Sequence, residues 1–152
     1  MRGLITRTLA AVVVASGVGL GQPAVAAPEP PPLTVMVAST DTLGRVLTDP
    51  NGHTLYRLDQ ERDGSIACFQ LCTDSRKPLL NPPGAELRLP PGIAGTLGTV
   101  SRPGGAGDQV TYDGSPLYTY VGDLQPADTD GVDLHWSVIN PQNAPEPAAT
   151  TR

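Results

Sequence analysis

The stretch DGSPLYTYVGD, residues 113–123, closely echoes an earlier stretch, NGHTLYRLDQE, residues 51–61. Each stretch has a turn-forming glycine, then an alternating run that contains Leu-Tyr, and then an acidic residue. At the offset of 62 residues the glycines, leucines and tyrosines coincide, and the acids coincide in charge. The two stretches predict two copies of one folding unit.

Each copy predicts a β-hairpin, although the two turns differ. In the first copy, DPNG at 49–52 suits a type I turn, because Pro50 has a fixed φ and Gly52 tolerates a positive φ. In the second copy, Asp113 and Gly114 suit a two-residue type I′ turn.

Short alternating runs dominate the rest of the chain, and prolines and glycines interrupt any helical period. This pattern is typical of an all-β protein, so we expect a small, mostly antiparallel domain built from two related hairpin repeats. The expected strands are LTVMVAS (33–39), GRVLTD (44–49), HTLYRL (53–58), GTVS (98–101), QVTY (109–112), PLYTYV (116–121) and LHWSVIN (134–140).

The repeated tyrosine and acid point to a structural contact inside each copy. Alternate residues share one face of a strand, so Tyr56 lies with Leu58, and we expect that face to point inward. A half-buried tyrosine needs a partner for its hydroxyl. The acid five residues on is Glu61 after Tyr56 and Asp123 after Tyr118. We therefore expect each tyrosine to bind the acid of its own copy and lock the strand to its loop.

Residues 1–26 have the features of a secretory signal peptide. Arg2 and Arg7 precede the apolar run LAAVVVASGVGLG, and AVA at 24–26 supplies a small-residue cleavage pattern. A membrane-spanning helix needs about 20 apolar residues, and no later segment approaches that length. No cysteine follows the cleavage pattern, so we expect a protein that is exported without a lipid anchor and does not span a membrane.

One domain is expected between two proline-rich ends. Residues 27–32 and 142–152 have too little apolar surface to offset the entropy of ordering, so both are expected to be disordered, and the β-rich domain covers 33–141. Without Arg2 and Arg7, eight cations remain against 15 acids, a net charge of −7. This balance argues against nucleic acid and anionic membranes as partners. An envelope component or another protein is the partner class left open.

Cys68 and Cys72 are the only cysteines. In an exported chain the default is one disulfide. It closes a short loop and is therefore expected to contribute about 2 kcal/mol. Neither His53 nor His135 stands at a zinc-site spacing from the pair, so no metal site is expected there.

These motifs together resemble a group of bacterial secreted-repeat proteins, many of them lipoproteins, that carry a Y-x4-D motif. The second copy contains the motif as YTYVGD at 118–123, and the resemblance extends over about residues 35–141. The family places a cysteine pair after the first copy, where Cys68 and Cys72 stand. The resemblance implies an extracytoplasmic β-rich domain of unassigned function.

Four features depart from that family pattern. Glu61 replaces the aspartate of the first motif, and Leu58 replaces its second aromatic residue. KPLLNPP at 77–83 lacks the tryptophan of the Trp-Pro-Pro segment, and the lipidated cysteine of many members is absent. The second copy is therefore the better candidate for a binding site.

The acid-rich loop GDLQPADTDGVD, residues 122–133, is the strongest candidate for function. Closely spaced carboxylates suit calcium, but the spacing of an EF-hand is missing. Asp-rich loops also form ordinary turns, in which side chains bond their own backbone. We expect no cofactor other than calcium.

The expected function is non-catalytic binding or an envelope-associated interaction, with no catalytic residue assigned. Tyrosines provide rigid contact area and acids provide direction in a binding site. The residues expected to bind a ligand are Tyr118, Tyr120, Asp123, Asp128 and Asp130. Two alternatives are a calcium-binding module and a hydrolase that uses Glu61 and Asp123 as paired carboxylates.

Overall fold

The structure is a computed structural model, and it describes residues 26–141. Apart from Ala26, the expected signal peptide lies outside the described residues, as does the expected tail at 142–152. Residues 27–32 form neither helix nor strand. The strands are β1 (Leu33–Thr34), β2 (Met36–Thr40), β3 (Gly44–Thr48), β4 (Tyr56–Leu58), β5 (Arg76–Pro78), β6 (Leu87–Arg88), β7 (Leu97–Ser101), β8 (Asp108–Tyr112), β9 (Ser115–Pro116), β10 (Tyr118–Tyr120) and β11 (Trp136–Val138).

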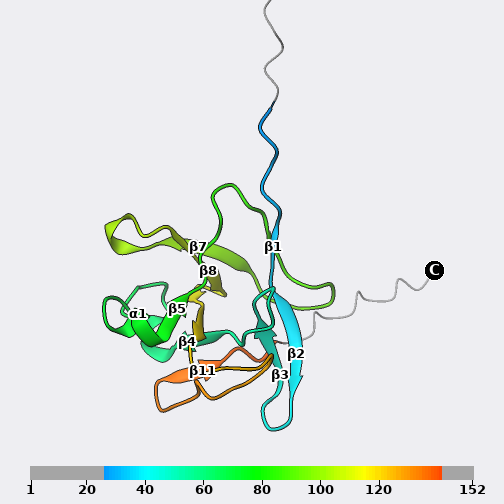
Figure 1. The fold of residues 1–152 in the computed structure, drawn as a ribbon, viewed down its shortest axis with the longest axis vertical. Coiled ribbons are helices and arrows are strands. Elements are labelled where there is room, and N and C mark those ends of the chain that lie inside the picture. Colours follow the sequence, from blue (N-terminus) through cyan, green and yellow to red (C-terminus); the bar gives the residue numbers. More distant parts are fainter. Residues whose placement is uncertain (1–25, 142–152) are drawn as a thin grey trace, which may run out of the picture.

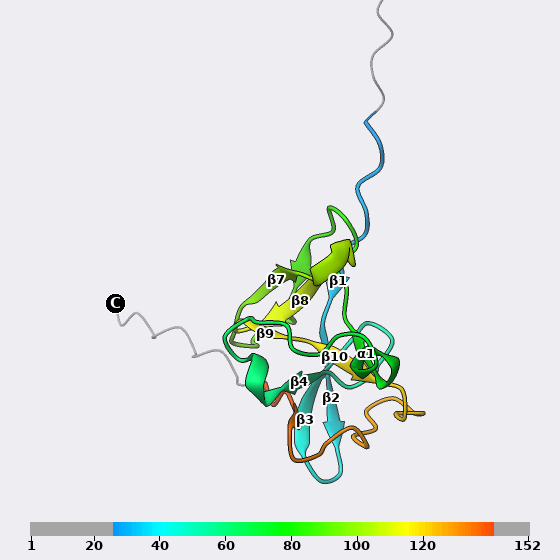
Figure 2. The ribbon, with the colours of Figure 1, turned by 90° about the vertical axis from the view of Figure 1, so that its left-hand side faces the viewer.

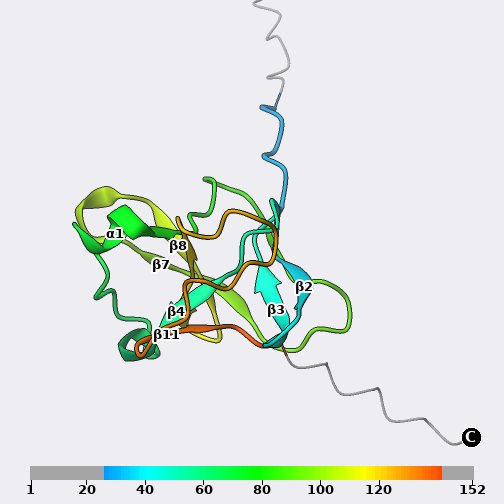
Figure 3. The ribbon, with the colours of Figure 1, turned by 60° about the horizontal axis from the view of Figure 1, so that its bottom comes forward.

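The sheets are small and mostly antiparallel, which confirms the expected all-β class. Within residues 26–141, helical structure is limited to short turns: η1 (Asp59–Glu61), α1 (Cys72–Ser75) and η2 (Pro103–Gly105). The four-stranded sheet β11-β4-β10-β5 lies between the β2–β3 hairpin and the β7–β8 hairpin (Figures 1 and 2). Its strands β11 and β4 lie side by side (Figure 3).

The four-stranded sheet joins the two copies of the repeat. Its strand β4 belongs to the first copy and pairs antiparallel with β10 of the second, with Tyr56 directly opposite Tyr118. Because equivalent residues meet in an antiparallel pair, the copies are related by a local two-fold axis that passes between the two tyrosines.

Both predicted hairpin turns are present. In the first copy, Asp49 N donates to His53 O and a bridge joins Thr48 to Thr54. In the second copy, Asp113 has φ 48° and Gly114 has φ 84°, the two positive values that a type I′ turn requires.

Several strands are shorter than expected. The run at 53–58 forms a bridge and a three-residue strand, while the runs at 33–39 and 116–121 each divide into two strands. Leu117, at one division, donates to Val110 O and accepts from Leu79 N. The chain therefore changes partners at this point, and this ends one strand and starts the next.

Hydrophobic clusters lie on both sides of the repeated strands. Tyr56 and Tyr118 belong to one cluster, which also contains Leu58 and Trp136. Leu55 and Leu117 belong to the other. All four of these repeated Leu-Tyr residues have an exposed fraction of 0%. The tyrosine face points inward as expected, and the opposite face of each strand is buried as well.

Candidate functional site

Each repeated tyrosine hydrogen bonds to the acid of the other copy. The Tyr56 hydroxyl donates to Asp123 Oδ2 over 2.8 Å, and the Tyr118 hydroxyl donates to Glu61 Oε1 over 3.1 Å. The prediction that each tyrosine binds the acid of its own copy is therefore wrong. In each copy, the acid comes after the end of the strand and lies away from the tyrosine of that strand. The loop that follows the paired strand of the other copy covers this tyrosine and brings its own acid to the hydroxyl.

Glu61 lies at the centre of the first network. It has an exposed fraction of 0%, and its Oε1 accepts from Ala67 N (2.5 Å) and Cys68 N (2.6 Å) as well as from Tyr118. Burial raises the pKa of Tyr118 to about 12, so its hydroxyl remains a proton donor at ordinary pH. This network ties the second tyrosine to the disulfide-bonded loop that follows the first copy.

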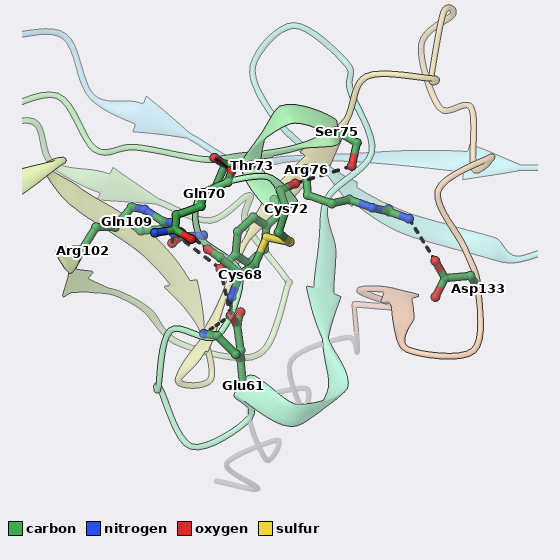
Figure 4. The surroundings of a disulfide bond; sticks show 12 residues. Glu61, Cys68, Gln70, Cys72, Thr73, Ser75, Arg76, Arg102, Gln109 and Asp133 are labelled. Carbon is green, nitrogen blue, oxygen red and sulfur yellow. Dashed lines mark hydrogen bonds and ion pairs between the residues drawn. A yellow bond between two sulfur atoms is a disulfide. The ribbon is translucent and has the colours of Figure 1, made fainter. Parts of the chain in front are cut away.

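Arg102 braces the same loop from the buried side. Its Nη2 donates to Cys68 O over 2.7 Å, and its Nη1 donates to Gln109 Oε1. Figure 4 shows Arg102 and Gln109 on one side of the disulfide, with Glu61 below it. Cys68 is thus held at its N–H by Glu61 and at its carbonyl by Arg102. The predicted Cys68–Cys72 disulfide is present.

Asp123 lies at the centre of the second network. It is buried, its Oδ1 accepts from Asp130 N (3.1 Å), and Gly131 N donates to the Tyr56 hydroxyl (3.2 Å). Burial raises the pKa of Asp123 above its ordinary value. Burial, followed by the bond to Asp123, raises the pKa of Tyr56. The network anchors the segment after β10 to the tyrosine of the first copy.

Arg76, on strand β5, lies among three aromatic rings. Its guanidinium carbon is 4.3 Å from the centre of the Tyr120 ring, 4.6 Å from that of Trp136 and 5.4 Å from that of Tyr56. Arg76 also pairs with Asp133 over 3.2 Å, as Figure 4 shows. Burial lowers the pKa of Arg76. Its aromatic and acidic contacts are the surroundings that stabilise a desolvated cation.

Most carboxylates of the acid-rich loop accept bonds from the backbone. Asp128 Oδ2 accepts from Leu124 N (2.9 Å) and Gln125 N (2.7 Å). Asp133 Oδ1 accepts from the backbone N–H groups of His135 (2.8 Å) and Trp136 (3.0 Å), and these bonds lower its pKa. Within residues 26–141, no group of three or more His, Cys, Asp or Glu side chains is arranged to hold a metal ion.

The residues expected to bind a ligand differ in exposure. Tyr118 and Asp123 are buried, Tyr120 and Asp128 are half-buried, and Asp130 is exposed. Sequence reasoning missed Arg76 and Arg102. No local motif marks either of them, because their partners are up to 57 residues away along the chain.

The model of a family described as a secreted repeat of unknown function matches residues 98–140. This segment begins within β7, ends just after β11 and contains the whole second copy, so the resemblance found in the sequence is confirmed over these residues. The disulfide fits the extracellular location that the family description implies. No curated protein and no solved structure matches the chain. Among the helices of residues 26–141, none has the length and apolar character needed to cross a membrane.

Proposed function

We propose that this chain is a secreted, non-catalytic protein that binds a partner in the cell envelope. The contact surface is the loop at 121–134, which we term the display loop. The observation that carries the proposal is the exposure of Leu124 and Leu134, which are 80% and 92% exposed on this loop. Val121 and Val132, at 51% and 43%, add apolar surface to it.

Internal bonds hold the display loop in place. Asp123 and Gly131 bind the Tyr56 hydroxyl, and Asp128 binds two N–H groups of the loop. Ala127 N donates to Gly52 O over 3.0 Å, which fastens the middle of the loop to the turn of the first copy. An ordered loop loses less conformational entropy on binding, so its exposed apolar side chains are well suited to a partner.

The same geometry disfavours the hydrolase alternative. A glycosidase places both of its carboxyl groups on either side of the scissile bond, where they meet substrate. Glu61 and Asp123 are instead 0% and 6% exposed and are bonded to tyrosines and backbone N–H groups. Asp123 thus supports the display loop from within, whereas Tyr118 binds Glu61 beside the disulfide loop. Asp128 is half-buried and Asp130 is exposed on the display loop, and Tyr120 is half-buried in the preceding strand β10.

Co-sedimentation of the purified protein with an envelope fraction of the producing organism tests the proposal. The variant Leu124→Ser/Leu134→Ser is expected to bind at least tenfold more weakly, since burying one leucine contributes about 1.5–3 kcal/mol. Leu71→Ser is the matched control, because Leu71 is 84% exposed but lies outside the display loop. Equal binding by the double variant and the control, or no sedimentation of the wild type, contradicts the proposal.

A further inference from the structure

A hollow of about 550 Å³ lies beside the disulfide loop and includes no residue of the display loop. We term it the basic hollow. It is lined by Phe69, Gln70, Thr73, Lys77, Pro78, Leu80, Arg102, Pro103, Gly104 and Ala106. Small-molecule sites typically have volumes of about 300–1,000 Å³, a mostly apolar lining and a few polar groups. The basic hollow has that size and that composition.

The charge of the lining is opposite to that of the protein. Lys77 and Arg102 are cationic, and the other eight lining residues carry no charge. The whole chain, in contrast, has a net charge of −5. The positive charge of the lining attracts an anion to the hollow, whereas the net negative charge of the protein repels an anion from the rest of the surface.

The disulfide loop forms a fixed wall of the hollow. Phe69 and Gln70 lie between the two cysteines, and Arg102, 7% exposed, binds the carbonyl of Cys68. The Thr73 hydroxyl donates to Gln70 O over 2.6 Å, which fastens the loop to α1. Phe69 is nevertheless 50% exposed, and Leu80, which also lines the hollow, is 41% exposed. The wall is held by the fold, and its apolar side chains remain open to solvent.

We propose that the basic hollow binds a small amphiphilic anion, with an apolar body against Phe69 and Leu80 and a single anionic group at Lys77. An adjoining hollow of about 410 Å³ meets the first at Leu80 and contains Asp108. This acid disfavours the reverse orientation of the ligand. The site goes beyond the proposed envelope contact and does not depend on it, because the two surfaces use different residues.

Fluorescence titration with 8-anilinonaphthalene-1-sulfonate, an aromatic anion, tests the site. We expect saturable binding to the folded protein, displaced by octanoate more effectively than by octanol. Phe69→Ser and Lys77→Gln are each expected to weaken binding by roughly fivefold, the effect of one partly exposed contact. Circular dichroism and the urea midpoint establish that each variant is folded.

Two control variants separate the hollow from general surface effects. Leu71→Ser removes an exposed apolar side chain from the same disulfide loop, outside the lining. Arg62→Gln removes one exposed positive charge, as Lys77→Gln does, also outside the lining. Both controls are expected to bind as the wild type does. The proposal is overturned by a lack of saturable binding, by equal displacement with octanol, or by equal losses in the Lys77 and Arg62 variants.

Discussion

The Tyr56 hydroxyl donates a 2.8 Å hydrogen bond to Asp123, which belongs to the other copy of the repeat. Tyr118 and Glu61 form the reciprocal bond. In each copy, the hydroxyl of the buried tyrosine therefore donates its hydrogen bond to an acid of the other copy. The repetition thus serves to join the two halves of one domain.

This exchange predicts which residues are energetically coupled. In double-mutant cycles of unfolding free energy, Tyr56→Phe with Asp123→Asn and Tyr118→Phe with Glu61→Gln are expected to show coupling of about 1 kcal/mol or more, because each pair shares a hydrogen bond. The within-copy pairs, Tyr56→Phe with Glu61→Gln and Tyr118→Phe with Asp123→Asn, serve as controls and are expected to be additive within about 0.5 kcal/mol. Stronger coupling within the copies than between them contradicts the exchange.

The close packing of Gly131 predicts that a methyl group will not fit there. A Cβ at this position lies 2.6 Å from Arg76 Nη1, 2.7 Å from Tyr56 Cζ and 2.8 Å from Tyr120 Cβ. Gly131→Ala is expected to lower the unfolding free energy by about 3 kcal/mol, because several buried groups must move.

Gly92→Ala is the control for Gly131→Ala. Beyond the adjacent residues of the chain, a Cβ at Gly92 would meet no atom within 4 Å, and the φ of Gly92 is +77°, so the cost is about 1 kcal/mol of backbone strain. Urea unfolding measures both variants. Equal losses of unfolding free energy in the two variants contradict the close packing around Gly131.

The buried carboxyl of Asp123 predicts a pH dependence of stability. Because its folded-state pKa is raised above 3.8, the folded protein holds this proton more tightly than the unfolded chain. The stabilisation is present below pH 3.8 and is lost as the pH rises through the folded-state pKa. Asp123→Asn removes this dependence. The unfolding free energy of the wild type minus that of the variant is therefore expected to decrease as the pH rises from 3 to 7.

Asp63→Asn gives the opposite trend and provides the control. Bonds from the Ser65 side chain and backbone lower the pKa of Asp63, so its contribution is present above the unfolded value and lost as the pH falls. Urea unfolding at each pH measures both slopes. If the difference in unfolding free energy from the wild type changes with pH in the same direction for both variants, the opposite pKa shifts of Asp123 and Asp63 are contradicted.

The Cys68–Cys72 disulfide is expected to stabilise the fold without determining it. Cys68→Ser/Cys72→Ser opens a short loop and is expected to cost about 2 kcal/mol. Glu61 and Arg102 still hold the backbone at position 68, so the near-ultraviolet circular dichroism of the variant is expected to stay close to that of the wild type. Loss of cooperative urea unfolding in the variant shows instead that the disulfide is essential to the fold.

Features that depend on neighbouring residues were predictable from the sequence. The Asp113–Gly114 turn requires two positive φ values, and this residue pair tolerates them wherever the strands lie. The alternation around Tyr56 predicts an extended, inward-facing segment for the same local reason. The sequence separation of only four positions between Cys68 and Cys72 also keeps the two cysteines close in any compact loop. In contrast, β5 was missed, because Arg-Lys-Pro has no strand-like alternation and pairs only through its place beside β10.

By itself, the sequence determined that the chain contains two copies of a hairpin with a tyrosine and an acid at matching positions. Only the tertiary structure decided which acid each tyrosine binds and which cations lie beside the aromatic rings. The physical reason is that turn and strand preferences act over a few residues, whereas a side-chain hydrogen bond depends on which strands pair. Here the pairing of Tyr56 with Tyr118 brings together residues 67 positions apart in the chain, Tyr56 and Asp123.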